Sequence, residues 1–147
     1  MEMSGHEKLL RDVTSTQYFA VLSTLGEGVP YSNLVSLAVS DDLRSLVFAT
    51  GRSTRKYVNM QGNSNVSLLV DNRSNEPADI SQAVAITAIG IALEETDEGR
   101  PFQTIFLNKH PHLKQFVEDP GTATMVVTVR EYIIAGFDRT QRVAMSR

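Results

Sequence analysis

The sequence has no cysteine and no tryptophan in 147 residues. Without cysteine there can be no disulfide bond, thiol catalysis or cysteine-ligated metal site. Histidine is also scarce, and His110 and His112 flank a proline with no third histidine nearby, which favours a helix-breaking surface turn over a metal site. No apolar run approaches membrane-spanning length, and no apolar signal region opens the chain, so we expect a cytoplasmic protein.

The chain also has no large excess of positive or negative charge. The formal net charge is −3 at pH 7, which argues against general nucleic-acid binding. No histidine–aspartate relay to a serine or threonine can be recognised, so a hydrolase triad is not expected. The hydrophobic content of 41% is ordinary for a globular protein, and the length suits one domain spanning residues 1–147.

Strand-forming runs dominate the chain, and turn residues separate them. Gly26-Glu27-Gly28 is a hairpin signal, and Gly90 predicts a bend within a long apolar run. The expected strands are 18–25, 31–39, 43–49 (or 45–49), 66–70, 83–93, 123–130 and 132–137. The expected helices are 6–14, 53–61, 97–108 and 113–117, with an exposed polar loop at 72–81. Strands joined mostly by hairpins predict a mainly β protein, an antiparallel barrel of six to seven strands with peripheral helices.

Two of these runs, 83–93 and 123–135, are apolar on both faces in places. In a small barrel one face of each strand fills the interior, so the other face needs a cover. We expect a second copy of the chain to provide it, which predicts a homodimer.

Positive charge occupies an unusual place in the segment 48–56. Phe48 ends a buried strand, Thr50 and Gly51 form the exit turn, and Ser53 or Thr54 is the expected N-cap of a short helix. A helix N-terminus carries partial positive charge and usually attracts acidic residues. Here Arg55 and Lys56 occupy the first turn, and Arg52 precedes the cap, whereas Thr96-Asp97-Glu98 elsewhere shows the usual acidic start.

This arrangement suits a bound dianion. Backbone N–H groups, the hydroxyls of Thr50, Ser53 or Thr54, and the two cations would hold it. The alternative is a set of solvated surface cations. The acidic run Glu94, Glu95, Asp97 and Glu98 is interpreted as a solvated strand-to-helix turn.

The segment 19–72 resembles the pyridoxamine-phosphate-oxidase-like flavin-binding split-barrel family. The matching features are a strand, a G-x-P turn at Gly28, a second strand, the pattern F-x-T-x-x-S-x-R-K from Phe48, a short helix, an Asn-rich turn and V-S-L-L-V from Val66. The resemblance extends less specifically to the C-terminal part of the chain.

The resemblance implies FMN as the cofactor, with the flavin phosphate as the expected dianion. By position, Thr54, Arg55 and Lys56 match the residues that hold the phosphate, and Ser53 stays a candidate from the charge pattern. Ala49 and Thr50 match the strand end that lines the ribityl chain and phosphate. The strand from Leu34 to Val39 matches the one whose backbone faces the isoalloxazine ring. Its likeliest contacts are Leu34, Val35, Ser36 and Leu37.

The family site lies at a two-fold dimer interface. Residues around Gln82, and Arg139 or Arg142 in the C-terminal segment, are therefore expected to contribute from the partner. Tyr31 or Phe137 are candidates to stack on the flavin.

The chain also departs from the family pattern. True pyridoxamine-phosphate oxidases have Arg and Lys where this chain has Leu34 and Val39, and they carry a C-terminal Trp and Arg that complete the substrate phosphate pocket. Here the only late cations are Arg139, Arg142 and Arg147. The vitamin B6 oxidase reaction is therefore not expected.

The sequence favours an FMN-dependent oxidoreductase of unknown substrate, for which no catalytic acid or base can be named. The alternative is a non-catalytic module that stores or senses flavin, or that binds haem or deazaflavin. No metal ligands are assigned.

Overall fold

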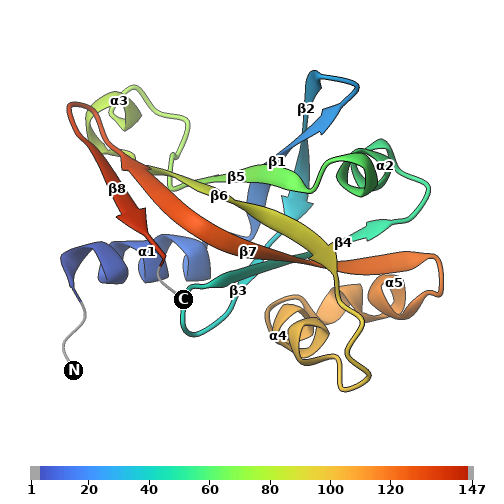
Figure 1. The fold of residues 1–147 in the computed structure, drawn as a ribbon. Helices are drawn as coiled ribbons and strands as arrows, with labels where there is room; N and C mark the ends of the chain where they lie inside the picture. Colours follow the sequence, from blue (N-terminus) through green and yellow to red (C-terminus); the bar gives the residue numbers. More distant parts are fainter. Residues whose placement is uncertain (1–3, 146–147) are drawn as a thin grey trace.

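The computed structural model describes residues 4–145 and contains one antiparallel sheet with short helices around it (Figure 1). The helices are α1 (Gly5–Thr16), α2 (Arg55–Gly62), α3 (Asp79–Gln82), α4 (Pro101–Lys109) and α5 (Lys114–Glu118), with a 3-10 turn η1 (Pro111–Leu113). The strands are β1 (Phe19–Gly26), β2 (Val29–Ser36), β3 (Ala38–Val39), β4 (Ser45–Gly51), β5 (Asn65–Asp71), β6 (Ala85–Glu94), β7 (Thr122–Ala135) and β8 (Thr140–Ala144).

The order of strands shows how the sheet curls into a barrel. Neighbours run β2-β1-β5-β6-β7-β4-β3, and β8 pairs with the second half of β7. Only Leu37 separates β2 from β3, so one short segment forms both ends of this series. The Leu37 N–H donates to the Tyr18 carbonyl oxygen at 2.9 Å, which ties the junction back to β1. The predicted mainly β, antiparallel split barrel with peripheral helices is confirmed.

Alternate side chains of the strands fill the barrel. Among the fully buried ones are Leu22, Leu68, Ile86, Val127 and Tyr132. The Tyr132 hydroxyl donates to the Leu43 carbonyl oxygen at 2.7 Å, so this buried phenol keeps a partner. Each such large apolar side chain contributes about 1.5–3 kcal/mol on burial.

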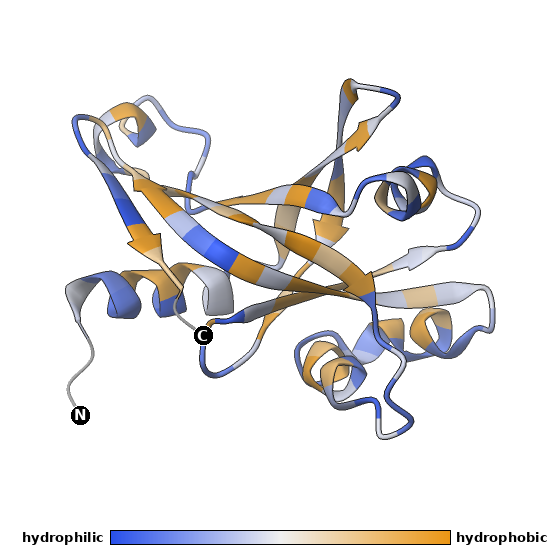
Figure 2. Cartoon of the chain, viewed as in Figure 1, coloured by the Kyte–Doolittle hydropathy of each residue, from blue (hydrophilic) through white to orange (hydrophobic). Residues whose placement is uncertain are grey.

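A smaller apolar cluster lies beneath α4 and α5. Phe106 and Val117 from these helices pack against Ala38 and Val47 of β3 and β4. The orange inward faces of both helices in Figure 2 meet the sheet at this place. These helices therefore cover the β3–β4 side of the barrel.

Helix α1 packs on the barrel through Leu10 and Val13. Its C-terminal carbonyl groups are satisfied by a residue distant in sequence, because Lys109 Nζ donates to the carbonyl oxygens of Thr14 (2.9 Å) and Gln17 (2.6 Å). A cation at a helix C-terminus also complements the helix dipole.

The bend predicted at Gly90 is confirmed as a break in the β6–β7 register. Ile89 pairs with Glu131 and Gly90 with Val129, which leaves Arg130 as an extra residue on β7. A Cβ added at Gly90 would lie 2.2 Å from the Thr128 carbonyl oxygen, so only glycine fits there.

The two strands expected at 123–130 and 132–137 are wrong as separate strands, because β7 is continuous from Thr122 to Ala135. The bulge explains the wrong prediction. The polar pair Arg130 and Glu131 interrupts an apolar run, as a turn between two strands would, but here it belongs to a bulge within one strand. Strand β8 was not predicted, since its sequence TQRVA is mostly exposed and polar. The helix expected from residue 97 begins at Pro101, and α3 begins at Asp79, near the end of the expected loop at 72–81.

The outward side of β6 has little cover. Ile89 and Ile91 are half-buried between buried neighbours, and Leu93 is 63% exposed. In the cartoon of Figure 2, β6 is coloured largely hydrophobic, whereas β7 carries a hydrophilic stretch in its middle. None of the helices within residues 4–145 is long and apolar enough to cross a membrane.

Candidate functional site

The site predicted at segment 48–56 lies where β4 passes into α2. Thr54 is the N-cap, and its Oγ1 accepts from the Tyr57 backbone N–H at 3.4 Å. The same oxygen donates to the Gly51 carbonyl oxygen at 2.8 Å and lies 2.8 Å from Thr50 Oγ1. These two hydroxyls therefore build the turn. The exposed Ser53 side chain makes no hydrogen bond within residues 4–145 and remains available to a ligand.

The three cations of this segment have different surroundings. Arg52 forms an ion pair with Glu94 and donates to the Pro120 carbonyl oxygen at 2.6 Å. The other Glu94 carboxylate oxygen accepts from the Tyr57 hydroxyl at 2.9 Å, and the Arg52 hydrogen bond is the main cause of the lowered pKa of Glu94. Arg52 is thus committed within the fold.

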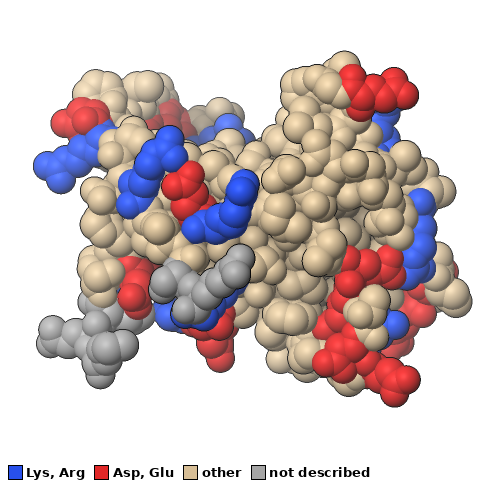
Figure 3. Space-filling view, in the orientation of Figure 1, with Lys and Arg blue, Asp and Glu red and all other residues tan. Residues whose placement is uncertain are grey.

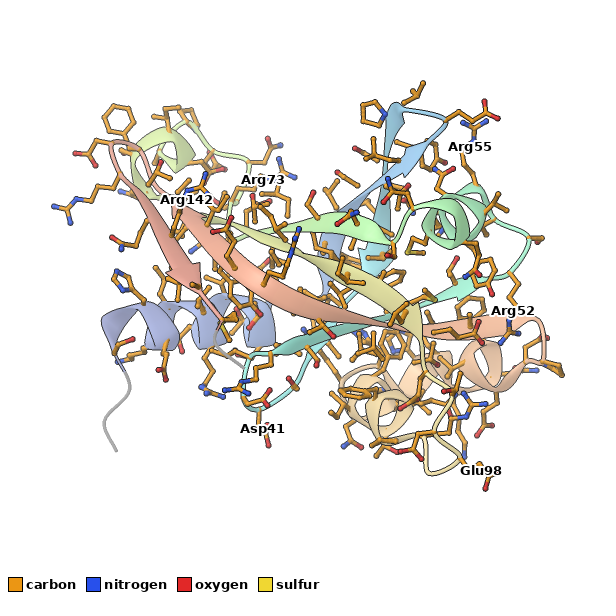
Figure 4. All side chains as sticks on the ribbon, in the orientation of Figure 1. Asp41, Arg52, Arg55, Arg73, Glu98 and Arg142 are labelled. Atoms are coloured by element: carbon orange, nitrogen blue, oxygen red, sulfur yellow. The ribbon has the colours of Figure 1, made fainter. Side chains whose placement is uncertain are left out.

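Arg55 and Lys56 take part in none of the ion pairs formed among residues 4–145. The Arg55 guanidinium lies over the Tyr31 ring, 5.5 Å from its centroid, and points toward the β1–β2 hairpin (Figure 4). Lys56 is half-buried, and this burial lowers the pKa of its amine. Two cations without carboxylate partners therefore flank the open N-terminus of α2.

The start of α4 provides the contrast within the same fold. The buried Glu95 carboxylate accepts from the backbone N–H groups of Phe102 (2.8 Å) and Gln103 (3.1 Å). Figure 3 shows acidic side chains gathered at this end of the molecule, at lower right. The interpretation of Glu94 and Glu95 as a solvated turn is wrong, because both carboxylates are bound within the fold.

The predicted flavin-facing residues of β2 divide between two faces. Leu34 is 68% exposed and Ser36 half-buried, whereas Val35 and Leu37 point into the core. Any contact from the latter two to a ligand would have to come from their backbone. Both Leu37 backbone groups have partners, since its carbonyl oxygen accepts from His110 Nε2 at 2.8 Å.

Asn33 is a residue of this strand that the sequence analysis missed. Within residues 4–145, its Oδ1 is the buried side-chain atom that lacks a hydrogen-bond partner. By strand alternation Asn33 shares a face with Tyr31, on which Arg55 rests. That face also carries the core residue Val35, so the orphaned Oδ1 lies at the inner side of the strand. The sequence signal that could have identified this residue is the presence of an asparagine among strand-forming residues.

The residues expected from a partner chain lie away from α2. Gln82 is exposed at the end of α3, which sits at the opposite end of the sheet (Figure 1). Arg142 on β8 pairs with Glu131 at 2.8 Å, and Arg139 lies in the turn before β8. Arg147 lies outside the described residues. The chain therefore brings together Ala49, Thr50 and residues 53–56, but not Gln82, Arg139 or Arg142.

A groove of about 680 Å³ runs beside α2. One wall is the helix face that presents Arg55, Val58, Asn59 and Gly62. The opposite wall is the hairpin turn 25–28. Asn59 fixes the helix to the hairpin, because its Nδ2 donates to the buried Thr24 Oγ1 at 3.0 Å. The groove thus begins at one of the two unpaired cations.

Comparison with known proteins gives the chain its family. Residues 7–134 match the family model described as pyridoxamine 5′-phosphate oxidase. The chain belongs to the pyridoxamine 5′-phosphate oxidase family. A search of curated proteins finds no significant match.

Solved structures share the fold of this pyridoxamine 5′-phosphate oxidase family member at low sequence identity. A haem-binding protein from Mycobacterium smegmatis superposes with a TM-score of 0.85 at 16% identity, over 98% of this chain and 59% of that one. This chain therefore spans under two thirds of that protein. General stress protein 26 from Bacillus anthracis gives 0.71 at 22% identity, over 92% and 97%. An FAD-binding protein from Mesorhizobium loti gives 0.65 at 19%, over 97% and 96%.

His110 is a buried residue of this family member, so the expected surface turn is wrong at this position. The ring is 1% exposed, packs on Phe106 with centroids 4.8 Å apart, and holds the Leu37 carbonyl. Since a carbonyl only accepts, Nε2 carries the proton. His112 is exposed, as expected for a turn, and no group of metal-ligating side chains occurs within residues 4–145.

We expect His110 to make folding sensitive to acid. Burial, opposed by the Leu37 carbonyl, lowers its pKa below the usual 6.5. The folded state then binds fewer protons than the unfolded state between the folded pKa and 6.5, so stability falls as pH decreases through that window. His110→Gln removes this titration. Urea unfolding from pH 7 to pH 5 should show a shallower loss for His110→Gln than for the wild type, and equal slopes would contradict the assignment.

Proposed function

We propose that this protein binds FMN, with the flavin phosphate at the start of α2. One observation carries the proposal. Arg55 and Lys56 lie in the first turn of α2, which contains no acidic residue, and neither cation has a carboxylate partner, whereas the neighbouring Arg52 is paired with Glu94. A phosphate would restore the charge balance of this turn. Membership of the pyridoxamine 5′-phosphate oxidase family supports the same cofactor.

The residues present fit this group. Arg55 and Lys56 supply charge-assisted hydrogen bonds, and the exposed Ser53 hydroxyl adds a neutral donor. Thr50 and Thr54 act indirectly, because their paired hydroxyls shape the turn that presents the backbone N–H groups. Tyr31 holds the Arg55 guanidinium in place before a ligand arrives.

The remaining part of the flavin is assigned to β2 and the end of β4. Ala49 and Thr50 lie next to the phosphate site in the chain, and the backbone of residues 34–36 is the proposed surface for the ring, because both backbone groups of Leu37 already have partners. We assign Gln82 and Arg139 or Arg142 to the site of the partner protomer, since α3 and β8 lie away from α2 in their own chain (Figure 1).

Bound FMN would supply hydride or electron transfer, and the chain would hold, orient and shield it. No acid or base among residues 4–145 can be assigned to proton transfer at this site. The proposed activity is therefore an FMN-dependent oxidoreductase reaction with an unidentified substrate. A non-catalytic role in flavin binding, storage or sensing is the competing hypothesis, and turnover with reduced nicotinamide cofactors and an electron acceptor separates the two.

The binding proposal is tested by titrating the protein with FMN, riboflavin and haem. Quenching of flavin fluorescence should show FMN binding at least about ten-fold tighter than riboflavin, because only FMN has the phosphate. Equal affinities for both flavins would contradict a phosphate site at α2. Haem binding without FMN binding would replace flavin by haem as the cofactor.

We propose that the protein forms a homodimer through the outward side of β6 and β7. Ile89, Ile91 and Leu93 are the apolar side chains that need cover there. Sedimentation equilibrium should give twice the mass of the chain at micromolar concentration, and Leu93→Lys should shift the equilibrium toward monomer. A wild-type monomer that still binds FMN tightly would contradict both the dimer and a site shared between protomers.

We expect little or no oxidation of pyridoxamine phosphate. This reaction requires a second set of cations that anchors the substrate phosphate, and misplacement by ~1 Å can cost about a hundred-fold in rate. Leu34 and Val39 stand where the family resemblance puts Arg and Lys, and the sequence has no tryptophan. Anaerobic mixing of FMN-loaded protein with pyridoxamine phosphate should leave the flavin spectrum unchanged over minutes, and rapid bleaching would contradict this prediction.

A further inference from the structure

Two residues of α2 contact one cross-strand pair of the β1–β2 hairpin. The register of the two strands places Thr24 directly opposite Tyr31, so their side chains lie on the same face of the hairpin. Asn59 Nδ2 donates to Thr24 Oγ1 at 3.0 Å, and the Arg55 guanidinium lies over the Tyr31 ring, 5.5 Å from its centroid. Each contact therefore joins one residue of the helix to one strand of the hairpin.

The spacings of the two residue pairs match. Arg55 and Asn59 are four positions apart in α2, so they lie on one side of the helix with Cβ atoms about 5–6 Å apart. Residues opposite one another in antiparallel strands have Cβ atoms about 4.5–5.5 Å apart. The helix can therefore make both contacts at once in this alignment, and a shift of α2 by one turn would break both.

Gly26 allows the helix to approach the hairpin this closely. It lies two positions after Thr24 and so on the same face of β1. A Cβ added at Gly26 would lie 2.2 Å from Asn59 Oδ1, whereas the backbone of Gly26 is outside the left-handed region. This position therefore requires the absence of a side chain, and an alanine there would meet Asn59 without straining the backbone.

The contact between Asn59 and Thr24 is buried, since Asn59 is 8% exposed and Thr24 is fully buried. A neutral hydrogen bond of this kind adds little net stability, but breaking it leaves a buried donor unsatisfied. Such pairs specify one alignment of the elements that they join. The alignment here fixes the first turn of α2, because Arg55 begins the helix one turn before Asn59.

We propose that Asn59 and Thr24 are positioning residues for the phosphate site, because their contact holds α2 where Arg55 rests on Tyr31. This inference rests on the proposed phosphate site at the start of α2. The cation–π contact attracts the guanidinium without a hydrogen-bond acceptor, so its N–H groups stay free to donate to a ligand. A long side chain is then ordered before binding, which raises the affinity for ligands that carry a phosphate.

The test compares the dissociation constants of FMN and riboflavin in Gly26→Ala and Thr24→Val. Both variants retain Arg55 and Lys56. Gly26→Ala displaces the Asn59 side chain, and Thr24→Val removes the hydroxyl at nearly constant side-chain volume. Each variant should bind FMN about three- to ten-fold more weakly than the wild type and riboflavin within about two-fold of it, because only FMN has the phosphate.

Matched variants keep the contact between the helix and the hairpin. Gly62→Ala adds the same methyl group at the end of α2, where a Cβ has no atom within 4 Å, and Thr24→Ser retains the hydroxyl. Both should bind FMN within about two-fold of the wild type.

A double-variant cycle tests whether the buried contact acts through Arg55. Tyr31→Leu should also weaken FMN binding, whereas Tyr31→Phe should not, because phenylalanine keeps the ring. If Thr24 acts by holding Arg55 on this ring, Thr24→Val should weaken FMN by less than about two-fold further when it is added to Tyr31→Leu. Full additivity of the two losses would contradict the proposed route.

The preference for FMN over riboflavin separates positioning from a general effect on the fold. The inference is wrong if Gly26→Ala and Thr24→Val lower the melting temperature but keep the wild-type preference, or if they weaken both ligands equally. The phosphate site stands in that case, because the wild type still prefers FMN. Equal binding of both flavins by the wild type would remove the phosphate site and the positioning role together. Should Thr24→Val fail to fold, Gly26→Ala against Gly62→Ala decides.

Discussion

Gly90→Ala is expected to destabilise the protein by about 2–5 kcal/mol, a large share of the total stability of a domain of this size. The added Cβ would lie 2.2 Å from the Thr128 carbonyl oxygen and 3.0 Å from a methyl group of Val127. The Thr128 carbonyl belongs to the backbone of β7, which is paired with β4 on one side and β6 on the other. It therefore cannot move without breaking hydrogen bonds between the strands.

Urea unfolding followed by circular dichroism measures this effect. Gly136→Ala is the control, because a Cβ there has no atom within 4 Å and the backbone is not in the left-handed region. We expect the Gly136 variant to unfold within about 0.5 kcal/mol of the wild type. A Gly90 variant as stable as the control would show that the bulge can relax around a side chain.

The double variant Arg55→Gln/Lys56→Gln is expected to weaken FMN binding by about a hundred-fold or more. Each charge-assisted hydrogen bond to phosphate contributes about 1.5–3 kcal/mol, which corresponds to roughly ten- to hundred-fold in affinity. The two positions are adjacent, so their effects need not add fully. Riboflavin affinity should stay the same, because that ligand has no phosphate. Fluorescence titration of both ligands gives the two constants.

Arg52→Gln is the matched control for this pair. It removes a cation three positions from Arg55, but this cation is bound to Glu94 and the Pro120 carbonyl oxygen. We expect FMN affinity within about three-fold of the wild type and a stability loss below about 1 kcal/mol, as for other solvent-exposed ion pairs. If all three cations contribute equally to FMN binding, the site is a diffuse positive surface rather than the start of α2.

Local features were predicted well from the sequence because their causes lie within a few residues. The Thr54 cap acts on Tyr57 three positions later, and the turn at Gly28 needs a positive φ that glycine adopts freely. The bend at Gly90 was also predictable, since glycine inside an apolar strand marks a bulge. These local signals suffice to predict the hairpin, the short helix and the cationic turn.

Long-range pairings explain what the sequence could not reveal. Arg52 and Glu94 are 42 positions apart, and His110 meets Leu37 across 73 positions, so neither contact leaves a local pattern. The buried cap from Glu95 is of the same kind, because it depends on where β6 ends relative to α4.

The position of β7 in the chain has a consequence for how the protein is made. This strand pairs with β4, β6 and β8, yet it begins only at Thr122. A growing chain on the ribosome must therefore carry β4 and the outer edge of β6 without their main partner until most of the sequence has been translated. Unpaired apolar edges of this kind are where nascent chains associate wrongly, so assembly of this barrel depends on the arrival of a late strand.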